Sequence, residues 1–198
     1  MHVSPIGHCN DVPPRARRWG SLAVRVGGFT LIELLIVLGI IVVLLSLVLA
    51  TFSHARKQAQ GVECLYHLHQ IHDAFNFYCM ENNNYFPVPQ LQGQSWESMI
   101  QKYVGGHTDV FRCPADSEIW QQVGSSYDWR SSSSDPSVSL GGKKRTDKLR
   151  GDAVLAYETL PDWHEVHMMN VVRIDGAAGP MDEDAFGQDV LNPVILSR

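Results

Sequence analysis

The sequence predicts an α+β fold in which one long N-terminal helix packs on a small antiparallel β-sheet. Three observations lead to this class. Residues 29–52 are almost wholly apolar, and residues 53–83 contain no proline and repeat apolar side chains three and four positions apart. Beyond residue 110, short runs rich in β-branched and aromatic residues alternate with turn residues, which is typical of short strands.

The apolar segment is long enough to cross a membrane. From residue 34 to residue 50, Gly39 and Ser46 are the only residues that are not apolar. A helix over residues 29–52 would span about 36 Å, which suits about 30 Å of hydrocarbon. A cleaved secretory signal differs, because its core has about 7–15 residues and its small-residue cleavage site follows the core. Here a glycine pair, Gly27-Gly28, precedes the core instead.

Charge predicts the orientation of this helix. Residues 1–28 contain four arginines and one aspartate, whereas Arg56 and Lys57 are the basic residues that closely follow the apolar segment. By the positive-inside rule, the N-terminus stays in the cytoplasm and the chain from about residue 53 is exported. We therefore expect a single-pass protein of the inner membrane with a periplasmic or otherwise extracytoplasmic C-terminal domain.

The start of the apolar segment carries a recognisable motif. From Gly28 it reads GFTLIELLIVLGIIVVLL, with Glu33 as its one charged residue. This stretch resembles the N-terminal signal of type IV pilins and pseudopilins. The resemblance implies a leader peptide of residues 1–28, cleavage by a prepilin peptidase between Gly28 and Phe29, N-methylation of Phe29, and assembly with other pilin or pseudopilin subunits through Glu33.

The same resemblance divides the chain into parts. Residues 29–52 would form the transmembrane and assembly helix, and residues 53–198 the exported pilin-like domain, which includes the amphipathic helix half 53–83. Three further stretches are similar to elements of type II secretion pseudopilin-like proteins: CLYHLHQIHDAFNFYCMENNNYFP, VFRCPAD and HMMNVVRIDG. The last resembles their C-terminal H…DG element, in which nine residues usually separate His from Asp-Gly. Here His164 has ten and His167 has seven, so the role of that histidine does not transfer.

Glu33 has a physical reason to act in assembly. A carboxylate at membrane depth costs a few kcal/mol at minimum, so an intramembrane acidic residue points to function. The amine of Phe29, freed by cleavage in the same or a neighbouring subunit, would be the nearest cation. Such a pair would fix the axial register of neighbouring helices. The alternative is an interfacial Glu33 that reaches the lipid headgroups.

The exported part is predicted element by element. The long helix ends near Asn82–Asn84, and a short helix over 95–104 begins at Ser95 and stops at Gly105. Residues 110–116 are expected to be extended and to end in a turn. Strands are expected at 126–130, 153–158 and 170–174, with Asp175-Gly176 as a hairpin turn into a return strand. The helix face that covers the sheet comprises Leu68, Ile71, Phe75 and Tyr78, with Val154, Tyr157 and Val172 among its partners.

The cysteines allow one disulfide outside the membrane. Cys9 belongs to the predicted leader, which leaves Cys64, Cys79 and Cys113. Cys64 and Cys79 would lie roughly 22 Å apart along one helix, too far to bridge each other. Cys113 can therefore pair with Cys64 or with Cys79 in an oxidising compartment. The alternative is three buried thiols.

The sequence offers little support for catalysis or for a bound cofactor. It contains no nucleophile elbow, metalloprotease helix, phosphate loop or dinucleotide fingerprint, so we expect no enzyme. The histidines are interpreted as solvated surface residues, because zinc needs three or four convergent ligands. They are His67, His69, His72, His164 and His167. Calcium is possible at four acidic residues of a C-terminal loop, and a solvated acidic loop is the simpler interpretation. These are Asp182, Glu183, Asp184 and Asp189.

Charge also bears on partners. Without residues 1–28, the chain has 12 Lys and Arg against 20 Asp and Glu, a net charge of −8. A nucleic-acid binder would need a basic face, so no nucleic acid is expected as a partner. The basic run Lys143-Lys144-Arg145 is interpreted as a charged hairpin tip, although a pilin for DNA uptake would use such a patch.

Together these features predict a structural pseudopilin or minor pilin-like subunit. It would be processed by the prepilin peptidase and assembled into a type II secretion or type IV pilus-like filament. The alternative is a membrane-anchored extracytoplasmic binding module that does not polymerise. Residue 33 discriminates between them, because only assembly needs its carboxylate.

Overall fold

The computed structural model describes residues 28–88, 93–131 and 135–196. The predicted leader therefore lies outside the described residues, apart from Gly28. The chain divides into two compact units, Met1–Leu45 and Ser46–Arg198. A long N-terminal helix and a four-stranded antiparallel sheet confirm the predicted α+β class.

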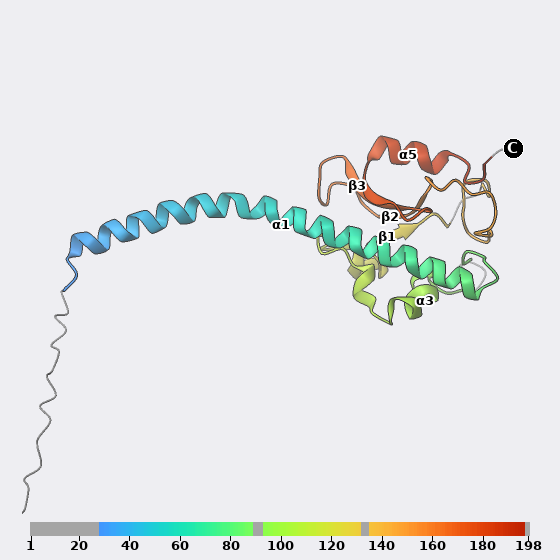
Figure 1. Cartoon of the computed structure of the whole chain (residues 1–198), viewed down its shortest axis with the longest axis horizontal. Coiled ribbons are helices and arrows are strands. Elements are labelled where there is room, and N and C mark those ends of the chain that lie inside the picture. The colour runs from blue at the N-terminus through green and yellow to red at the C-terminus, as the bar shows by residue number, and fades with distance from the viewer. Residues whose placement is uncertain (1–27, 89–92, 132–134, 197–198) are drawn as a thin grey trace, which may run out of the picture. The chain divides into compact units, whose positions relative to one another are not determined.

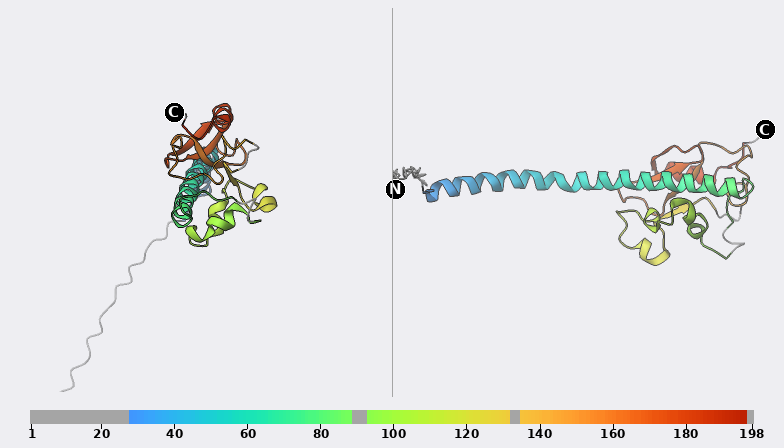
Figure 2. Two further views of the ribbon diagram at one scale, coloured as in Figure 1. Left: turned by 90° about the vertical axis from the view of Figure 1, so that its right-hand side faces the viewer. Right: turned by 60° about the horizontal axis from the view of Figure 1, so that its bottom comes forward.

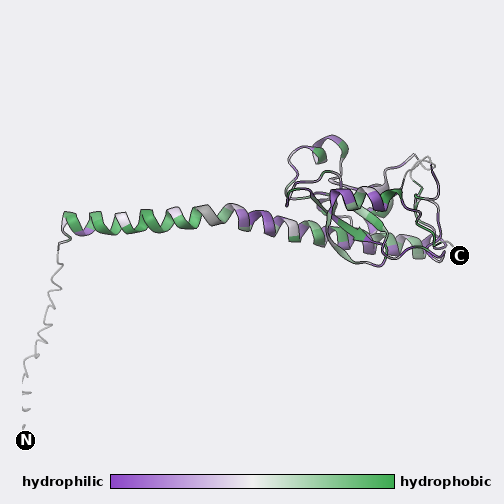
Figure 3. Ribbon diagram, turned by 90° about the horizontal axis from the view of Figure 1, so that it is seen from above, coloured by the Kyte–Doolittle hydropathy of each residue, from purple (hydrophilic) through white to green (hydrophobic). Residues whose placement is uncertain are grey.

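Helix α1 runs without a break from Leu31 to Glu81 (Figure 1). Its ends agree with the predicted helix to within two residues. It stops where Asn83 and Asn84 take φ values of 54° and 63°, a left-handed conformation that asparagine tolerates better than most residues. The N–H of Asn84 donates to the carbonyl oxygen of Cys79 at 2.8 Å and closes the last turn. Figure 3 shows the apolar first part of α1 and the polar residues that follow it.

The sheet in the second unit has the order β1-β2-β3-β4, and every neighbouring pair is antiparallel. The strands are β1 (Tyr127–Trp129), β2 (Val154–Glu158), β3 (Met168–Arg173) and β4 (Ala178–Asp182). The predicted turn joins β3 to β4: Gly176 has φ 91°, and Asp175 accepts a hydrogen bond from the N–H of Ala177 at 2.9 Å. The predicted strands and hairpin are thus confirmed.

Short helices surround the sheet and α1. The segment predicted as one helix is α3 (Trp96–Ile100) followed by the 3₁₀ helix η1 (Gln101–Val104). Its predicted caps are confirmed, because Ser95 accepts a hydrogen bond from the N–H of Ser98 and Gly105 takes φ 70°. In the second unit, α3 and its neighbours lie on the other side of α1 from the sheet (Figures 1 and 2).

Two segments differ from the prediction. Residues 110–116 begin in the 3₁₀ helix η2 (Thr108–Phe111) and not in extended backbone, whereas Arg112 is extended and a tight turn follows, as predicted for the end of this segment. The turn is held by the carboxylate of Asp116, which accepts hydrogen bonds from three backbone N–H groups at the start of α4 (Ile119–Val123). The acidic C-terminal segment is not a loop, because most of it forms α5 (Glu183–Leu191) with Asp182 as its N-cap.

One stripe of α1 forms the main core. Leu68, Ile71 and Phe75 are fully buried, and Tyr78 is 8% exposed, as the spacing predicted. Phe75 lies at the centre of an aromatic group, with its ring centroid 4.7 Å from that of Trp129. Val172 belongs to this core, which confirms one of the three predicted sheet partners.

The other two predicted partners, Val154 and Tyr157, lie on the opposite face of the sheet, so that prediction is wrong. The pairing of β2 with β3 shifts between Val154 and Ala156, and a bulge of this kind interrupts the alternation of faces. Leu155 and Ala156 therefore both join the core beneath α1. Tyr157 packs on Phe186 of α5, with ring centroids 4.7 Å apart. Helices α1 and α5 thus cover opposite faces of the sheet (Figure 1).

Candidate functional site

The predicted cleavage and assembly residues open α1. Phe29 is 82% exposed and lies two residues before Leu31, the first residue of the helix. The carboxylate of Glu33 accepts hydrogen bonds from the N–H and the hydroxyl of Thr30 at 2.8 and 2.7 Å. The N–H of Glu33 in turn donates to the Thr30 hydroxyl at 3.3 Å. This reciprocal arrangement is a capping box, which satisfies backbone donors at the start of a helix. The Thr-x-x-Glu spacing carried this signal, which the sequence interpretation missed.

The helix surface that follows is apolar and uncovered. Each large apolar side chain between residues 31 and 49 is at least 44% exposed, so no described residue buries this surface. Among the described residues, α1 is the one helix that is long and apolar enough to cross a membrane. Such a surface is unfavourable in water, and burial in lipid or against other apolar groups would stabilise it.

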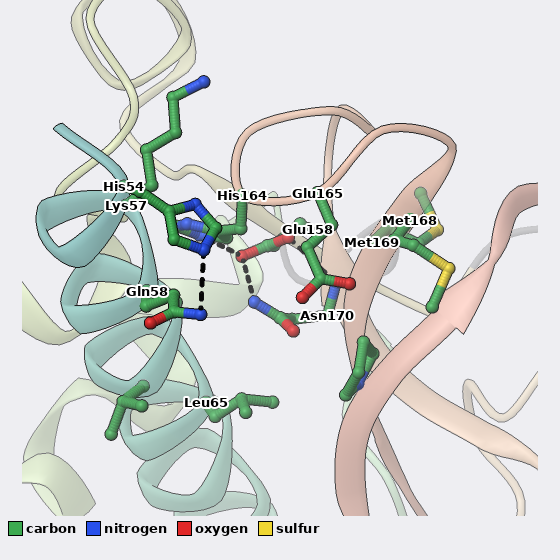
Figure 4. A pocket seen from close by; sticks show the side chains of 13 residues that line it. His54, Lys57, Gln58, Leu65, Glu158, His164, Glu165, Met168, Met169 and Asn170 are labelled. Carbon is green, nitrogen blue, oxygen red and sulfur yellow. Dashed lines mark hydrogen bonds and ion pairs between the residues drawn. The ribbon is translucent and has the colours of Figure 1, made fainter. Parts of the chain in front are cut away.

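The second unit contains a pocket of about 360 Å³ between α1 and the sheet (Figure 4). Its wall on α1 includes Lys57, Gly61 and Leu65, and its opposite wall includes Met169 of β3. His164 comes from the connection between β2 and β3 and packs over Gly61, where an added Cβ would meet the ring at 3.4 Å.

A buried carboxylate forms the floor of this pocket. The side chain of Glu158, the last residue of β2, is 1% exposed. Its Oε2 accepts a hydrogen bond from the N–H of Asn170 at 2.9 Å, and its Oε1 accepts one from the side-chain amide of Asn170 at 3.0 Å. Nε2 of His164 lies 3.1 Å from the same Oε1. The sequence interpretation did not single out Glu158, because only its tertiary surroundings distinguish it.

A disulfide lies against the histidine and the carboxylate. Cys64 of α1 is bonded to Cys113, with 5.4 Å between their Cα atoms, so the structure has one of the two pairings that the sequence left open. Cys79 is a buried free thiol. Sγ of Cys113 lies 3.4 Å from Nε2 of His164 and 3.9 Å from Oε1 of Glu158. A disulfide sulfur carries no proton, so in this state it donates no hydrogen bond to either group.

Three histidines are less exposed than predicted, so the surface interpretation is wrong for them. Nδ1 of half-buried His67 lies 3.0 Å from the carbonyl oxygen of Arg112, and burial lowers the pKa of His67 although this contact opposes the shift. The His72 side chain is 12% exposed, and that of His164 is 9% exposed. His69 and His167 are exposed, as predicted.

The four acidic residues that were considered as calcium ligands have different roles in the structure. The side chain of Asp182 caps α5 by accepting hydrogen bonds from the N–H groups of Asp184 and Ala185. The carboxylate of Asp189 instead binds two guanidinium groups, those of Arg130 and Arg150. Among the described residues, one group of potential metal ligands has its ligand atoms within 4.8 Å of one another: Cys64, Cys113, Glu158 and His164. Its two sulfurs are bonded to each other in this structure.

The basic run lies in a turn beside the end of α1. Lys144 forms an isolated antiparallel bridge with Tyr85, and its Nζ lies 5.1 Å from the centre of that ring. Nζ of Lys143 donates to the carbonyl oxygen of Pro136 at 2.6 Å. Lys144 and Arg145 are exposed. Lys143 therefore binds within the protein, whereas Lys144 and Arg145 are open to solvent.

Comparisons with family models, with characterised proteins and with solved structures gave no match to this chain. Two features therefore carry the functional inference: the start of α1 with its uncovered apolar surface, and the pocket beside the disulfide. The first is the simpler to interpret, because an exposed apolar helix requires a partner. The second is a polar cluster that the proposed filament does not require.

Proposed function

We propose that the chain is a pilin-like subunit, a structural pseudopilin or minor pilin that is assembled into a filament. It is made with the leader 1–28, inserted in the inner membrane, and cleaved by a prepilin peptidase before Phe29. The observation that carries the proposal is the start of α1. An exposed Phe29, one acidic residue in the first helical turn and an uncovered apolar surface follow one another there.

Filament assembly gives that surface a partner. Apolar helices of neighbouring subunits would pack on one another and on lipid through residues 31–49, all of whose large apolar side chains are exposed in the single chain. Helix α1 continues to Glu81 without a break, so the assembly segment and the helix that carries the exported core form one element. The Cys64–Cys113 disulfide suits export, because disulfides persist in oxidising compartments.

Cleavage would change the surroundings of Glu33. In the uncleaved chain its carboxylate caps the helix through Thr30. Removal of the leader creates a positive amine on Phe29, one residue before that cap. The amine of a neighbouring subunit can then neutralise Glu33, and the pair sets the axial register of the two helices. Methylation of the amine leaves its positive charge in place.

Two substitutions separate the charge of Glu33 from its capping role. Glu33→Gln removes the charge and keeps an oxygen that can accept hydrogen bonds from Thr30. Thr30→Ala removes the hydroxyl of the cap and keeps the charge. We expect membrane insertion and cleavage in both variants, and loss of crosslinked multimers only in Glu33→Gln. Equal multimers in Glu33→Gln and the wild type would reject the assembly role.

Mass spectrometry of the mature protein tests processing directly. The expected N-terminus is N-methylated Phe29. A mature chain that begins at Met1 would remove the peptidase from the proposal, and one that begins after Ala50 would indicate ordinary secretion.

The pocket beside α1 favours a second candidate, a membrane-anchored binding module that does not polymerise. A volume of about 360 Å³ is within the range of small-molecule sites. In that case residues 29–52 serve only as an anchor, and Glu33→Gln leaves the function unchanged. The multimer experiment therefore also discriminates between the two candidates.

A further inference from the structure

We propose that the chain, when its disulfide is reduced, binds one Zn²⁺ ion through Cys64, Cys113, His164 and Glu158. The structure holds the oxidised state, in which the two sulfurs are bonded to each other. Reduction would release two sulfur ligands beside a histidine and a carboxylate that already face them. The site is independent of filament assembly.

The spacing of the ligand atoms fits a tetrahedral ion. Zinc–sulfur bonds of about 2.3 Å and zinc–nitrogen or zinc–oxygen bonds of about 2.1 Å place neighbouring ligand atoms roughly 3.4–3.8 Å apart. Nε2 of His164 lies 3.4 Å from Sγ of Cys113 and 3.1 Å from Oε1 of Glu158. Sγ of Cys113 lies 3.9 Å from Oε1 of Glu158. All four ligand atoms lie within 4.8 Å of one another. Reduction allows the two bonded sulfurs to separate to the spacing that a tetrahedral ion requires.

The charge of the site also favours a cation. The side chain of Glu158 is 1% exposed. Among the described residues it forms an ion pair with His164, whose ring is charged only when it is protonated. Burying a carboxylate without a firm positive partner is costly. Zn²⁺ would supply that partner and would offset most of the negative charge of two thiolates and one carboxylate.

The groups around the ligands would orient them and give the ion access. Asn170 holds the Glu158 carboxylate with two hydrogen bonds, as outer groups orient ligands in metal sites. Nδ1 of His164 is buried without a hydrogen-bond partner, so the ring can carry its proton there while Nε2 binds the ion. Glu158 and His164 both line the pocket, which provides a path of entry.

The chemistry balances with a dithiol as the reductant. A dithiol gives two electrons and two protons to the Cys64–Cys113 bond, so the sulfur–sulfur bond breaks, two thiols form and the dithiol becomes a disulfide. Zn²⁺ then binds both sulfurs and releases their two protons to solvent. Cys64 and Cys113 thus link α1 to the segment after η2 by a covalent bond in the oxidised state and through the ion in the reduced state.

Cobalt is the probe for this site, because thiolate ligation gives Co²⁺ an intense charge-transfer absorption. The full chain in detergent, with Cys9→Ser in the leader, is reduced with a phosphine, freed of reductant without air and titrated with Co²⁺. We expect one equivalent to bind with the thiolate band and to be displaced by Zn²⁺. The oxidised protein, which has the same sequence, should show no band.

Variants identify the ligands. Loss of a side chain that only orients a metal ligand typically weakens metal binding 10–100-fold. Loss of a ligand should cost at least as much, so His164→Ala and Cys113→Ser should each weaken cobalt binding by about 100-fold or more. His167→Ala, at an exposed histidine of the same connection, and Cys79→Ser, at the remaining thiol, are matched controls that should bind as the wild type does. Circular dichroism checks that each variant folds.

Two results would overturn the site. One is a reduced, folded wild-type chain that gives no thiolate band with Co²⁺. The other is a band that keeps its strength in folded His164→Ala or Cys113→Ser. A variant that fails to fold does not obscure the outcome, because the reduced and oxidised forms of the wild type are compared directly.

Discussion

Arg130 and Asp189 form a buried ion pair that joins the end of β1 to α5. Nη1 of Arg130 lies 2.9 Å from Oδ2 of Asp189, and the two side chains are 5% and 12% exposed. Nη2 of Arg130 also donates to the carbonyl oxygens of Asp189, Val190 and Asn192 at the C-terminal end of α5. The last carbonyls of a helix lack full sets of partners within it, and Arg130 binds three of them, including that of Asp189, which also accepts a hydrogen bond from the N–H of Asn192 at 3.0 Å. Asp189 further accepts a hydrogen bond from the N–H of Val154 at 3.0 Å.

Replacing Asp189 with Asn should strongly destabilise the second unit, Ser46–Arg198. The change leaves the guanidinium of Arg130 buried without its counter-ion, and breaking such a pair typically costs about 3–5 kcal/mol. Asp184→Asn is the matched control, because Asp184 is an exposed residue of the same helix and its change should stay within about 0.5 kcal/mol. Urea unfolding of a soluble fragment that begins at Ser53 measures both. Similar small effects would mean that the pair contributes little to stability.

Phe75 and Phe77 lie two positions apart in α1 and test which face of the helix is buried. Phe75 is fully buried between aromatic rings, whereas Phe77 is 52% exposed. Phe75→Ala should cost about 3–5 kcal/mol of unfolding free energy, a large share of the roughly 5–15 kcal/mol of a typical domain. Phe77→Ala should cost about 1 kcal/mol or less. Thermal melts of the same fragment measure the difference. Equal losses of stability in the two variants would mean that the buried face of α1 is assigned wrongly.

The sequence predicted those parts of the fold that depend on local pattern. The three- and four-residue spacing located the buried stripe through Leu68 and Phe75 because helical geometry alone determines which side chains share a face. Asp175-Gly176 predicted the β3–β4 hairpin because the turn favours a residue that tolerates positive φ. Ser95 and Gly105 predicted the limits of a short helical segment for similar local reasons.

The remainder depends on contacts between distant residues. The bulge in β2 placed Val154 and Tyr157 on one face, and no local pattern announced it. His164 is buried because it packs against Gly61, about a hundred positions away in the chain. Glu158 resembled any polar strand residue until the fold set it beside His164 and Cys113. The candidate metal ligands thus come from three separate segments, and their convergence is a tertiary property.

Cys79 should resist alkylation in the folded, oxidised protein. Burial raises the pKa of its thiol to about 11, although the charge of Arg145 opposes the shift. The thiolate is the reactive form, and at pH 8 it would make up only about one part in a thousand. Treatment with iodoacetamide before and after unfolding in urea, followed by peptide mapping, should label Cys79 only in urea. A disulfide-linked Cys79–Cys113 peptide would instead establish the pairing that the structure does not have.

Asp116 should make the stability of the second unit sensitive to acid. Burial alone would raise the pKa of Asp116, but the hydroxyl of Ser126 and the N–H groups of Glu118, Ile119 and Trp120 bind the carboxylate and lower it overall. A carboxylate with a lowered folded pKa adds stability above the unfolded value of about 4. That contribution is lost as the pH falls through the lower folded value, because the unfolded chain takes up the proton first.

Asp116→Asn tests this coupling. The variant should lose about 1–3 kcal/mol at pH 7, since an amide cannot accept all four hydrogen bonds. Its unfolding free energy should also fall less than that of the wild type between pH 5 and pH 2, roughly one unit above and two below the unfolded pKa. Glu118→Gln, at an exposed carboxyl group two residues away, should retain the wild-type slope. Urea titrations across this range measure the slope, and an unchanged slope in Asp116→Asn would assign the acid sensitivity to other groups.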